Sequence, residues 1–197
     1  MSFRTEEKFY TDSDKYVDLK KYLILKGGKQ QFSKRLISSI YFDNHKFQSF
    51  TDSQEGSVMR KKIRIRTYPE SNNFNTYLEY KYSSIEGRYK ENNQITEDKK
   101  NFFLSNGIFD KKYGLCKPKL EVMYKREYYQ KNDVRVTIDT DISYKFYSKR
   151  KIAKDKITAV ELKTKISKDL DELFENFPFQ EIRFSKYCNG LNLLNKI

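Results

Sequence analysis

Cationic and apolar side chains alternate between residues 60 and 68. One parity holds Lys62, Arg64 and Arg66, and the other holds Ile63 and Ile65. Because successive side chains of a β-strand point to opposite faces, this pattern predicts a strand with a positively charged face and an apolar face that packs on a core. Like charges two residues apart lie roughly 6 to 7 Å from each other along a strand, and they repel unless an anion lies over them. We therefore expect a β-sheet that holds an anion rich in phosphate.

The same alternation recurs in other parts of the chain and predicts an antiparallel sheet. It is present in Glu79–Lys81, Arg135–Asp139 and Glu161–Lys163. Strands are predicted over residues 3–10, 37–42, 58–68, 76–82, 87–95, 119–130, 133–144 and 157–165. Helices are predicted from Asp12 or Ser13 to Gly27, from Thr96 to Asn106, around Leu170–Phe174, and from Ser185 to Leu194. Short links between the strands favour an α+β fold, an antiparallel sheet or barrel with peripheral helices.

Length and charge limit the possible functions. The 197 residues offer no clear boundary, so we expect one domain over residues 1–197. A net charge of +13 favours an anionic partner, which could be a phosphate-rich small molecule, a nucleic acid or an acidic membrane. An ordinary sheet with one solvated face would show the same alternation, but here arginine and lysine cluster with a few carboxylates on the predicted polar face.

Cysteine and histidine are too few for a structural zinc site. Cys116 and Cys188 lie in unlike contexts, and neither forms a spaced cluster with His45, the sole histidine. We expect His45 in an exposed turn and Cys188 as a small apolar residue of the last helix. The amino-terminal residues are charged, and no apolar run approaches the ~18 residues of a membrane span, so a cytoplasmic location is expected.

The mixture of arginine, lysine and a few carboxylates fits the chemistry of a phosphate chain with a divalent metal. Arginine can bind two phosphate oxygens at once, and lysine acts as a compact point charge. Mg²⁺ or Mn²⁺ is commonly held by one or two carboxylates together with substrate phosphates. The carboxylates on the predicted polar faces are Glu6, Glu79, Asp139 and Glu161. Each of them could instead pair with a cation on a neighbouring strand.

An ordered set of short motifs resembles a known family. The motifs are Tyr41-Phe42-Asp43-Asn44, Ile63-Arg64-Ile65-Arg66-Thr67-Tyr68, Glu79-Tyr80-Lys81, Tyr124-Lys125-Arg126, Arg135-Val136-Thr137-Ile138-Asp139-Thr140, Val160-Glu161-Leu162-Lys163 and Phe184-Ser185-Lys186-Tyr187. In order and spacing they resemble the polyphosphate polymerase (VTC) domain of the triphosphate tunnel metalloenzyme superfamily, which is CYTH-like. Glu6-Glu7-Lys8 is similar to the Glu-x-Lys signature of that superfamily.

The resemblance implies an antiparallel β-barrel, the triphosphate tunnel fold, and a metal-dependent transfer of the γ-phosphate of a nucleoside triphosphate onto polyphosphate. The phosphate-binding positions that it implies are Lys8, Arg64, Arg66, Lys81, Lys90, Arg126, Arg135, Lys163 and Lys186. Of these, Lys8, Arg64, Arg66, Lys81 and Lys186 are expected to act in catalysis. Glu161 matches the metal-binding glutamate, and Glu6 and Glu79 are further candidates for Mn²⁺ or Mg²⁺. Arg126 shares its parity with apolar Leu120 and Val122, so we expect a bulge to turn it toward the other cations.

Several functions remain open on the sequence alone. The resemblance implies ATP or another nucleoside triphosphate and polyphosphate as ligands, and a separate membrane protein as a partner. A triphosphatase or a nucleotidyl cyclase of the same fold would need the same cations. A receptor for polyphosphate or inositol phosphates would need the cations without the glutamates. A nucleic-acid-binding barrel is a further class, but the tyrosines mostly occupy the apolar parity, so nucleic acid is not expected.

Overall fold

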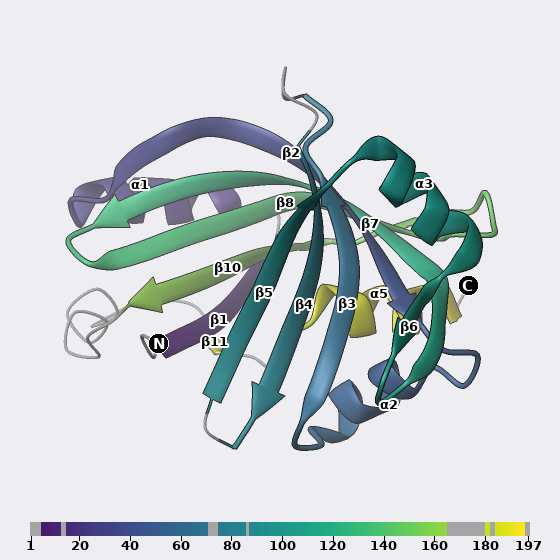
Figure 1. Ribbon diagram of the computed structural model, residues 1–197. Coiled ribbons are helices and arrows are strands. Elements are labelled where there is room, and N and C mark those ends of the chain that lie inside the picture. Colours follow the sequence, from purple (N-terminus) through teal and green to yellow (C-terminus); the bar gives the residue numbers. More distant parts are fainter. Residues whose placement is uncertain are drawn as a thin grey trace. The chain divides into compact units, whose positions relative to one another are not determined.

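The chain folds mainly into antiparallel strands with helices between them (Figure 1). The computed structural model describes residues 5–12, 15–70, 75–85, 87–164, 180–181 and 184–195. The strands are β1 (Thr5–Asp12), β2 (Lys29–Asp43), β3 (Arg60–Thr67), β4 (Thr76–Ser84), β5 (Gly87–Ile95), β6 (Ile108–Asp110), β7 (Gly114–Lys131), β8 (Val134–Phe146), β9 (Ile152–Lys154), β10 (Ile157–Thr164) and β11 (Gln180–Glu181). The helices are α1 (Tyr16–Leu25), α2 (Gln48–Glu55), α3 (Glu97–Asn106) and α5 (Lys186–Asn195).

Two compact units make up the chain. The first unit contains residues 1–35, 124–142 and 154–184, and the second contains residues 36–123, 143–153 and 185–197. The long strands β2, β7 and β8 therefore contribute residues to both. Strand order is β11-β1-β10-β8-β7-β2 in the first unit and β7-β2-β3-β4-β5 in the second. The expectation of a single domain stays a prediction.

In the first unit, one face of the sheet forms an apolar core beneath α1. Val136 and Ile138 of β8 and Val160 and Leu162 of β10 are buried there, as their parity predicted. Leu19 and Leu23 of α1 pack on the same core, and α1 lies within the range predicted to be helical. Since β-strand side chains alternate, the residues between these core positions lie on the opposite face.

The second unit repeats this arrangement with a separate core. Ile63 and Ile65 of β3, Leu78 of β4 and Ile95 of β5 are buried together, and Phe103 of α3 packs against them. The hydroxyl of Thr96 accepts a hydrogen bond from the backbone N–H of Lys99, so it caps α3 as predicted. The cations Arg64 and Arg66 lie between the core residues along β3, and so they belong to the other face.

Polar and exposed segments account for the differences between predicted and observed elements. β2 begins at Lys29, although the sequence predicted a strand only from residue 37. Residues 29–35 are exposed on the strand and carry no apolar alternation, so they gave no strand signal. The three-residue strands β6 and β9 were also not predicted, because so short a segment shows no period. The helix predicted around Leu170–Phe174 lies outside the described residues.

The Asp43-Asn44 pair ends β2 and starts α2. Both carboxylate oxygens of Asp43 accept backbone N–H groups from the first turn of the helix: Oδ1 from Ser49 at 3.0 Å and Oδ2 from Phe50 at 3.0 Å. The Asn44 side chain accepts from Gln48 N at 3.1 Å. The motif therefore satisfies the open donors of a helix N-terminus. His45 follows in an exposed turn.

Candidate phosphate-binding site

Strands β3, β4 and β5 align their cations in rows across the second unit. Lys62 lies directly opposite Lys81, which lies opposite Lys90. In the next row, Arg64 lies opposite Glu79, which lies opposite Asn92. By register, the cations of this face are Arg60, Lys62, Arg64, Arg66, Lys81, Arg88 and Lys90, and Glu79 is the one carboxylate on it within the described strands. We call this set the cationic face of the second unit.

Glu79 is the buried centre of this cationic face. Its side chain is 3% exposed. Arg64 donates from Nε to Glu79 Oε2 at 2.6 Å, and Lys90 Nζ donates to Oε1 at 3.0 Å. Nη1 of Arg66 lies 3.5 Å from Oε1. Three cations from two strands thus converge on one carboxylate, which fixes their positions while leaving the group positively charged.

The pKa values reflect this excess of positive charge. Burial raises the pKa of Glu79, but Arg64, Arg66 and Lys90 outweigh burial and hold that pKa at about 2. Burial lowers the pKa of Lys90, Glu79 raises it, and the two arginines lower it further, with a net decrease. A lysine whose charge is disfavoured by neighbouring cations gains from the arrival of an anion. The second unit therefore presents a cluster that is suited to bind phosphate.

Helix α5 packs on the cationic face of the second unit. Tyr187 stacks on Tyr41 with ring centroids 5.0 Å apart, and its hydroxyl donates to Asp43 Oδ2 at 2.7 Å. The Tyr41 hydroxyl accepts from Arg64 Nη1 at 2.9 Å. Two neighbouring tyrosines therefore connect the helix to the arginine that binds Glu79.

The N-terminus of α5 adds polar groups to the same face. Nζ of Lys62 donates to Ser185 Oγ at 2.9 Å, and Ser185 Oγ also accepts from the backbone N–H of Cys188 at 3.4 Å. Lys186, a predicted phosphate-binding residue, is the first residue of the helix. The second unit thus brings together Arg64, Arg66, Lys81 and Lys90 of the predicted set, and Lys186 follows Ser185, which binds Lys62.

A second group of predicted residues lies on the face of the first unit opposite its core. Lys8 of β1 is directly opposite Glu161 of β10, and Lys163 is directly opposite Arg135 of β8. Nζ of Lys163 lies 2.7 Å from Glu161 Oε1, and Lys8 donates to the carbonyl oxygen of Phe184 at 3.2 Å. Register also places Glu6 opposite Lys163, while the side chain of Glu6 is outside the described residues.

Arg126 forms a bidentate ion pair in the first unit. Its Nε and Nη2 donate to the two carboxylate oxygens of Asp139 at 2.6 and 2.7 Å. Burial lowers the pKa of Arg126, but Asp139 at bonding distance raises it well above its ordinary value. Asp139 alternates with core residues Val136 and Ile138, so Arg126 reaches the polar face of the first unit.

Leu120 and Arg126 share a parity along β7, but the burial of Leu120 does not show that Arg126 faces a core. Leu120 is buried because α5 packs near it. In the second unit, Leu120 is buried, and a Cβ atom added at Gly190 of α5 would lie 2.9 Å from its side chain. Since α5 also contacts Tyr41 and Lys62, this helix covers part of the polar face and requires apolar partners there. Apolar residues on β7 therefore do not mark the core side of the strand.

The two described carboxylates predicted to bind metal differ in their suitability. Glu79 is enclosed by three cations that already occupy its oxygens. Glu161 is more accessible, with a side chain 18% exposed and its Oε1 2.7 Å from Lys163 Nζ. Among the described residues, no three acidic, cysteine or histidine side chains form a group able to hold a metal. Glu161 therefore fits a divalent ion that takes most of its ligands from substrate phosphates and water.

The fold is that of the triphosphate tunnel proteins, and the site is a cluster of cations built on antiparallel strands. The VTC domain family matches residues 3–114 and 108–195, which is nearly the whole chain, and the chain belongs to that family. The resemblance seen in the ordered motifs is thereby confirmed.

Solved structures share the fold at low sequence identity. A protein of Bacillus halodurans proposed to be an adenylate cyclase has a TM-score of 0.67 and 13% identity, and the match covers 94% of this chain and 96% of that chain. The PH1012 protein of Pyrococcus horikoshii has a TM-score of 0.56 and 17% identity, with 90% and 94% covered. A Vibrio parahaemolyticus protein, also proposed to be an adenylate cyclase, has a TM-score of 0.57 and 15% identity, with 97% and 98% covered. The comparison with curated proteins returned no match.

Two polar residues of these sites, Tyr41 and Ser185, were not predicted to act there, and Asp139 was predicted only as a polar-face carboxylate that could hold a metal or pair with a neighbouring cation. Tyr41 binds Arg64, Ser185 binds Lys62, and Asp139 binds Arg126. All three lie within the motifs that carried the resemblance, so their presence in a motif was the available signal. Their contacts depend on which strand or helix lies opposite, and a single sequence does not give that register.

Proposed function

We propose that this protein is a metal-dependent polyphosphate polymerase, which transfers the γ-phosphate of a nucleoside triphosphate onto a polyphosphate chain. The observation that carries the proposal is the convergence of Arg64, Arg66 and Lys90 on the single carboxylate of Glu79. Membership of the VTC domain family supports the choice of reaction. The low-identity structural relatives support the fold alone.

The cationic face of the second unit is the proposed site for the phosphate chain. Arg64 and Arg66 are held in fixed positions by Glu79 and Tyr41, so little conformational entropy is lost when they bind phosphate oxygens. Lys81, Lys90 and Lys186 add point charges that offset the desolvation of a triphosphate. In the proposed reaction these cations align the attacking and leaving oxygens and stabilise the charge on the transferred group.

Glu161 is the proposed metal ligand, and Mn²⁺ or Mg²⁺ is the proposed ion. A divalent ion held by Glu161 would supply positive charge that offsets the charge developing on the phosphate oxygens. Nζ of Lys163 lies 2.7 Å from Glu161 Oε1 and orients this carboxylate. Lys8, Arg126, Arg135 and Lys163 remain predicted phosphate-binding residues of the first unit, and Glu6 remains a predicted metal ligand.

The partners follow from the chemistry of the proposed reaction. Nucleoside triphosphate and polyphosphate are the proposed ligands, and a separate membrane protein is a proposed partner that would receive the polymer. Among the helices that the structure describes, none is long and apolar enough to cross a membrane.

Incubation of the purified protein with ATP and Mn²⁺ or Mg²⁺ tests the proposal. We expect ADP and a ladder of phosphate polymer on a gel, and we expect both to disappear in Glu161→Gln while tripolyphosphate still binds. Free phosphate and ADP without polymer would instead support a triphosphatase of the same fold. Tripolyphosphate binding without any turnover, unchanged in Glu161→Gln, would contradict an enzyme and support a phosphate receptor.

A further inference from the structure

A hairpin of the second unit exposes apolar side chains beside lysines. Phe109 of β6 and Leu115 of β7 lie directly opposite each other and are 75% and 52% exposed. Their neighbours Ile108 and Cys116 also form a pair, and both are buried in the core of the unit. Because strand side chains alternate, Phe109 and Leu115 project from the outer face of the hairpin.

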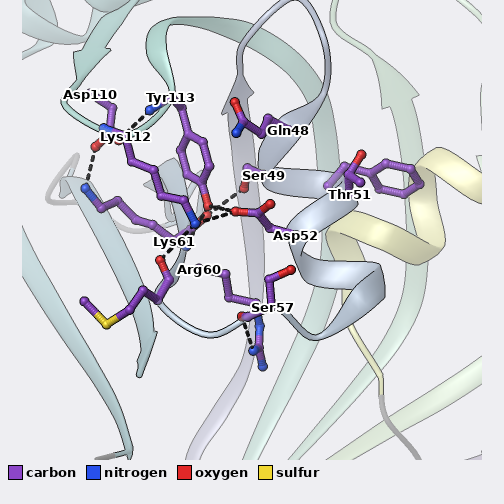
Figure 2. Close-up of polar contacts among 12 residues, drawn as sticks. Gln48, Ser49, Thr51, Asp52, Ser57, Arg60, Lys61, Asp110, Lys112 and Tyr113 are labelled. Atoms are coloured by element: carbon purple, nitrogen blue, oxygen red, sulfur yellow. Dashed lines mark hydrogen bonds and ion pairs between the residues drawn. The ribbon is translucent and has the colours of Figure 1, made fainter. Parts of the chain in front are cut away.

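The turn of the hairpin, at residues 110–113, is held by hydrogen bonds and ion pairs, so its outward side chains have a defined position (Figure 2). Asp110 Oδ1 accepts backbone N–H groups from Lys112 and Tyr113, and Asp110 Oδ2 binds Lys61 Nζ at 2.5 Å. The hydroxyl of Tyr113 and the Nζ of Lys112 both bind Asp52 of α2, at 3.0 and 2.6 Å. The acidic groups near the hairpin are therefore used within the protein.

The loop between β8 and β9 extends this surface. The backbone N–H of Tyr147 donates to the carbonyl oxygen of Lys119 on β7 at 2.9 Å, so the loop starts beside the hairpin strand. Residues 147–152 are all exposed, and they contain three cations and no carboxylate: Lys149, Arg150 and Lys151. Tyr147 and Ile152 at the two ends of the loop are 39% and 59% exposed.

Hairpin and loop together carry an unusual combination of charge and apolar surface. Residues 108–119 contain Lys111, Lys112, Lys117 and Lys119, and their one carboxylate, Asp110, is 4% exposed and paired. We call residues 108–119 and 147–152 the basic apolar surface. Cations alone would suit any polyanion, but a polyphosphate or an RNA backbone offers no match for exposed Phe109, Leu115 and Ile152. An anionic lipid bilayer matches both, since its headgroups attract the lysines and its interface accepts the apolar side chains.

We propose that the basic apolar surface binds the headgroup region of a membrane that contains anionic lipids. Lys149, Arg150 and Lys151 supply electrostatic attraction, and Phe109, Leu115 and Ile152 enter the interface. This surface is separate from the cationic face around Glu79, so it can bind a membrane independently of phosphate transfer. The protein would then attach to the membrane directly as well as through any protein partner.

Co-sedimentation of the full chain with vesicles tests this proposal. We expect binding to vesicles of phosphatidylcholine with phosphatidylglycerol and weak binding to phosphatidylcholine alone. The triple variant Lys149→Glu, Arg150→Glu, Lys151→Glu should bind at least about a hundredfold more weakly, because each cation near an anionic surface contributes about fivefold. The double variant Phe109→Ser, Leu115→Ser leaves the charge unchanged and should lose about tenfold.

Two controls make the test specific. The triple variant Lys125→Glu, Lys131→Glu, Lys156→Glu makes the same change of charge in the first unit and should change binding by less than about threefold. The variant Arg64→Ala, Arg66→Ala should retain vesicle binding while it loses tripolyphosphate, which separates this surface from the proposed catalytic site. Equal losses in the two charge-reversal triples would show that binding follows net charge and would overturn the proposal. Unchanged binding in Phe109→Ser, Leu115→Ser, with the fold verified by circular dichroism, would overturn the insertion of apolar side chains.

Discussion

The polar faces of the two units differ in how many cations are paired with each carboxylate. In the first unit, Arg126 has a bidentate partner in Asp139, and Lys163 lies against Glu161. In the second unit, Arg64, Arg66 and Lys90 share Glu79. Pairing one cation with one carboxylate stabilises the protein in the absence of a ligand. A cluster of three cations around one carboxylate keeps a net positive charge. A bound anion neutralises that charge and so stabilises the cluster.

The largest effect is expected from the ion pair of the first unit. Arg126→Met leaves Asp139 as a buried carboxylate without its bidentate partner, so the free energy of unfolding should fall by about 3 to 5 kcal/mol. Denaturant unfolding measures this loss. Affinity for tripolyphosphate should fall less than it does in Arg64→Ala. A greater loss of affinity than in Arg64→Ala, with unchanged stability, would show that Arg126 acts mainly on the ligand and would remove the contrast between the units.

Glu79→Gln should destabilise the second unit by a comparable amount. A folded-state pKa of about 2 against an ordinary 4.5 corresponds to about 3 kcal/mol of stability. Because the folded pKa is depressed, this contribution is present above pH 4.5 and is lost as the pH falls toward 2. Denaturant unfolding between pH 7 and pH 3 should show the loss of about 2 kcal/mol of it.

Stabilisation by tripolyphosphate should also differ between Glu79→Gln and the wild type. Without the carboxylate, the cations repel one another, so tripolyphosphate should stabilise the variant more than it stabilises the wild type. The matched control is Glu97→Gln, an exposed carboxylate of α3, which should change stability by less than about 0.5 kcal/mol. Equal stability of Glu79→Gln and the wild type at pH 7 would refute the central place of Glu79.

A smaller effect is expected where α5 meets the cationic face. Tyr187→Phe removes the hydrogen bond to Asp43 but keeps the stack on Tyr41. Hydrogen bonds to charged groups contribute about 1.5 to 3 kcal/mol, and Asp43 retains its backbone donors, so we expect a loss near the lower value. Thermal unfolding checks this. A gain in stability would show that the hydroxyl is not satisfied in the fold.

The smallest effect is expected when the planar guanidinium group of Arg64 is replaced but its charge is kept. Arg64→Lys keeps the positive charge but loses the planar group that contacts both Glu79 and Tyr41. We expect about a tenfold lower affinity for tripolyphosphate, or about 1.4 kcal/mol. Calorimetry measures it, with Lys99→Arg on α3 as the control. An unchanged affinity would mean that the site recognises charge alone.

The alternation of side chains predicted much of this structure, because β-strand geometry ties sequence parity to face. Ile63, Ile65, Val136 and Leu162 are buried as predicted, and Arg64 lies on the opposite face. The sequence indicated that Glu79 and Asp139 could pair with cations on neighbouring strands, but it did not give the register, so their particular partners were not foreseen. It also took Leu120 as a core-side residue, whereas α5 buries apolar residues on the polar side of the second unit.

Motifs were informative about family and less informative about the role of each residue. Asp43 and Asn44 belong to an ordered motif, yet their contacts are those of a helix cap. Tyr41 in the same motif contacts Arg64 in the proposed phosphate site. A residue that caps a helix can be adjacent in sequence to a residue that binds a ligand, because one turn of the chain positions both. Only the contacts of each residue show which role it has.

Titration calorimetry with tripolyphosphate tests whether the cationic face of the second unit binds a phosphate chain. The account predicts saturable binding to the wild type, at least about a hundredfold weaker binding to Arg64→Ala, Arg66→Ala, and little change in Lys99→Ala. Binding of wild-type strength by the double arginine variant, with its fold intact, would contradict the account.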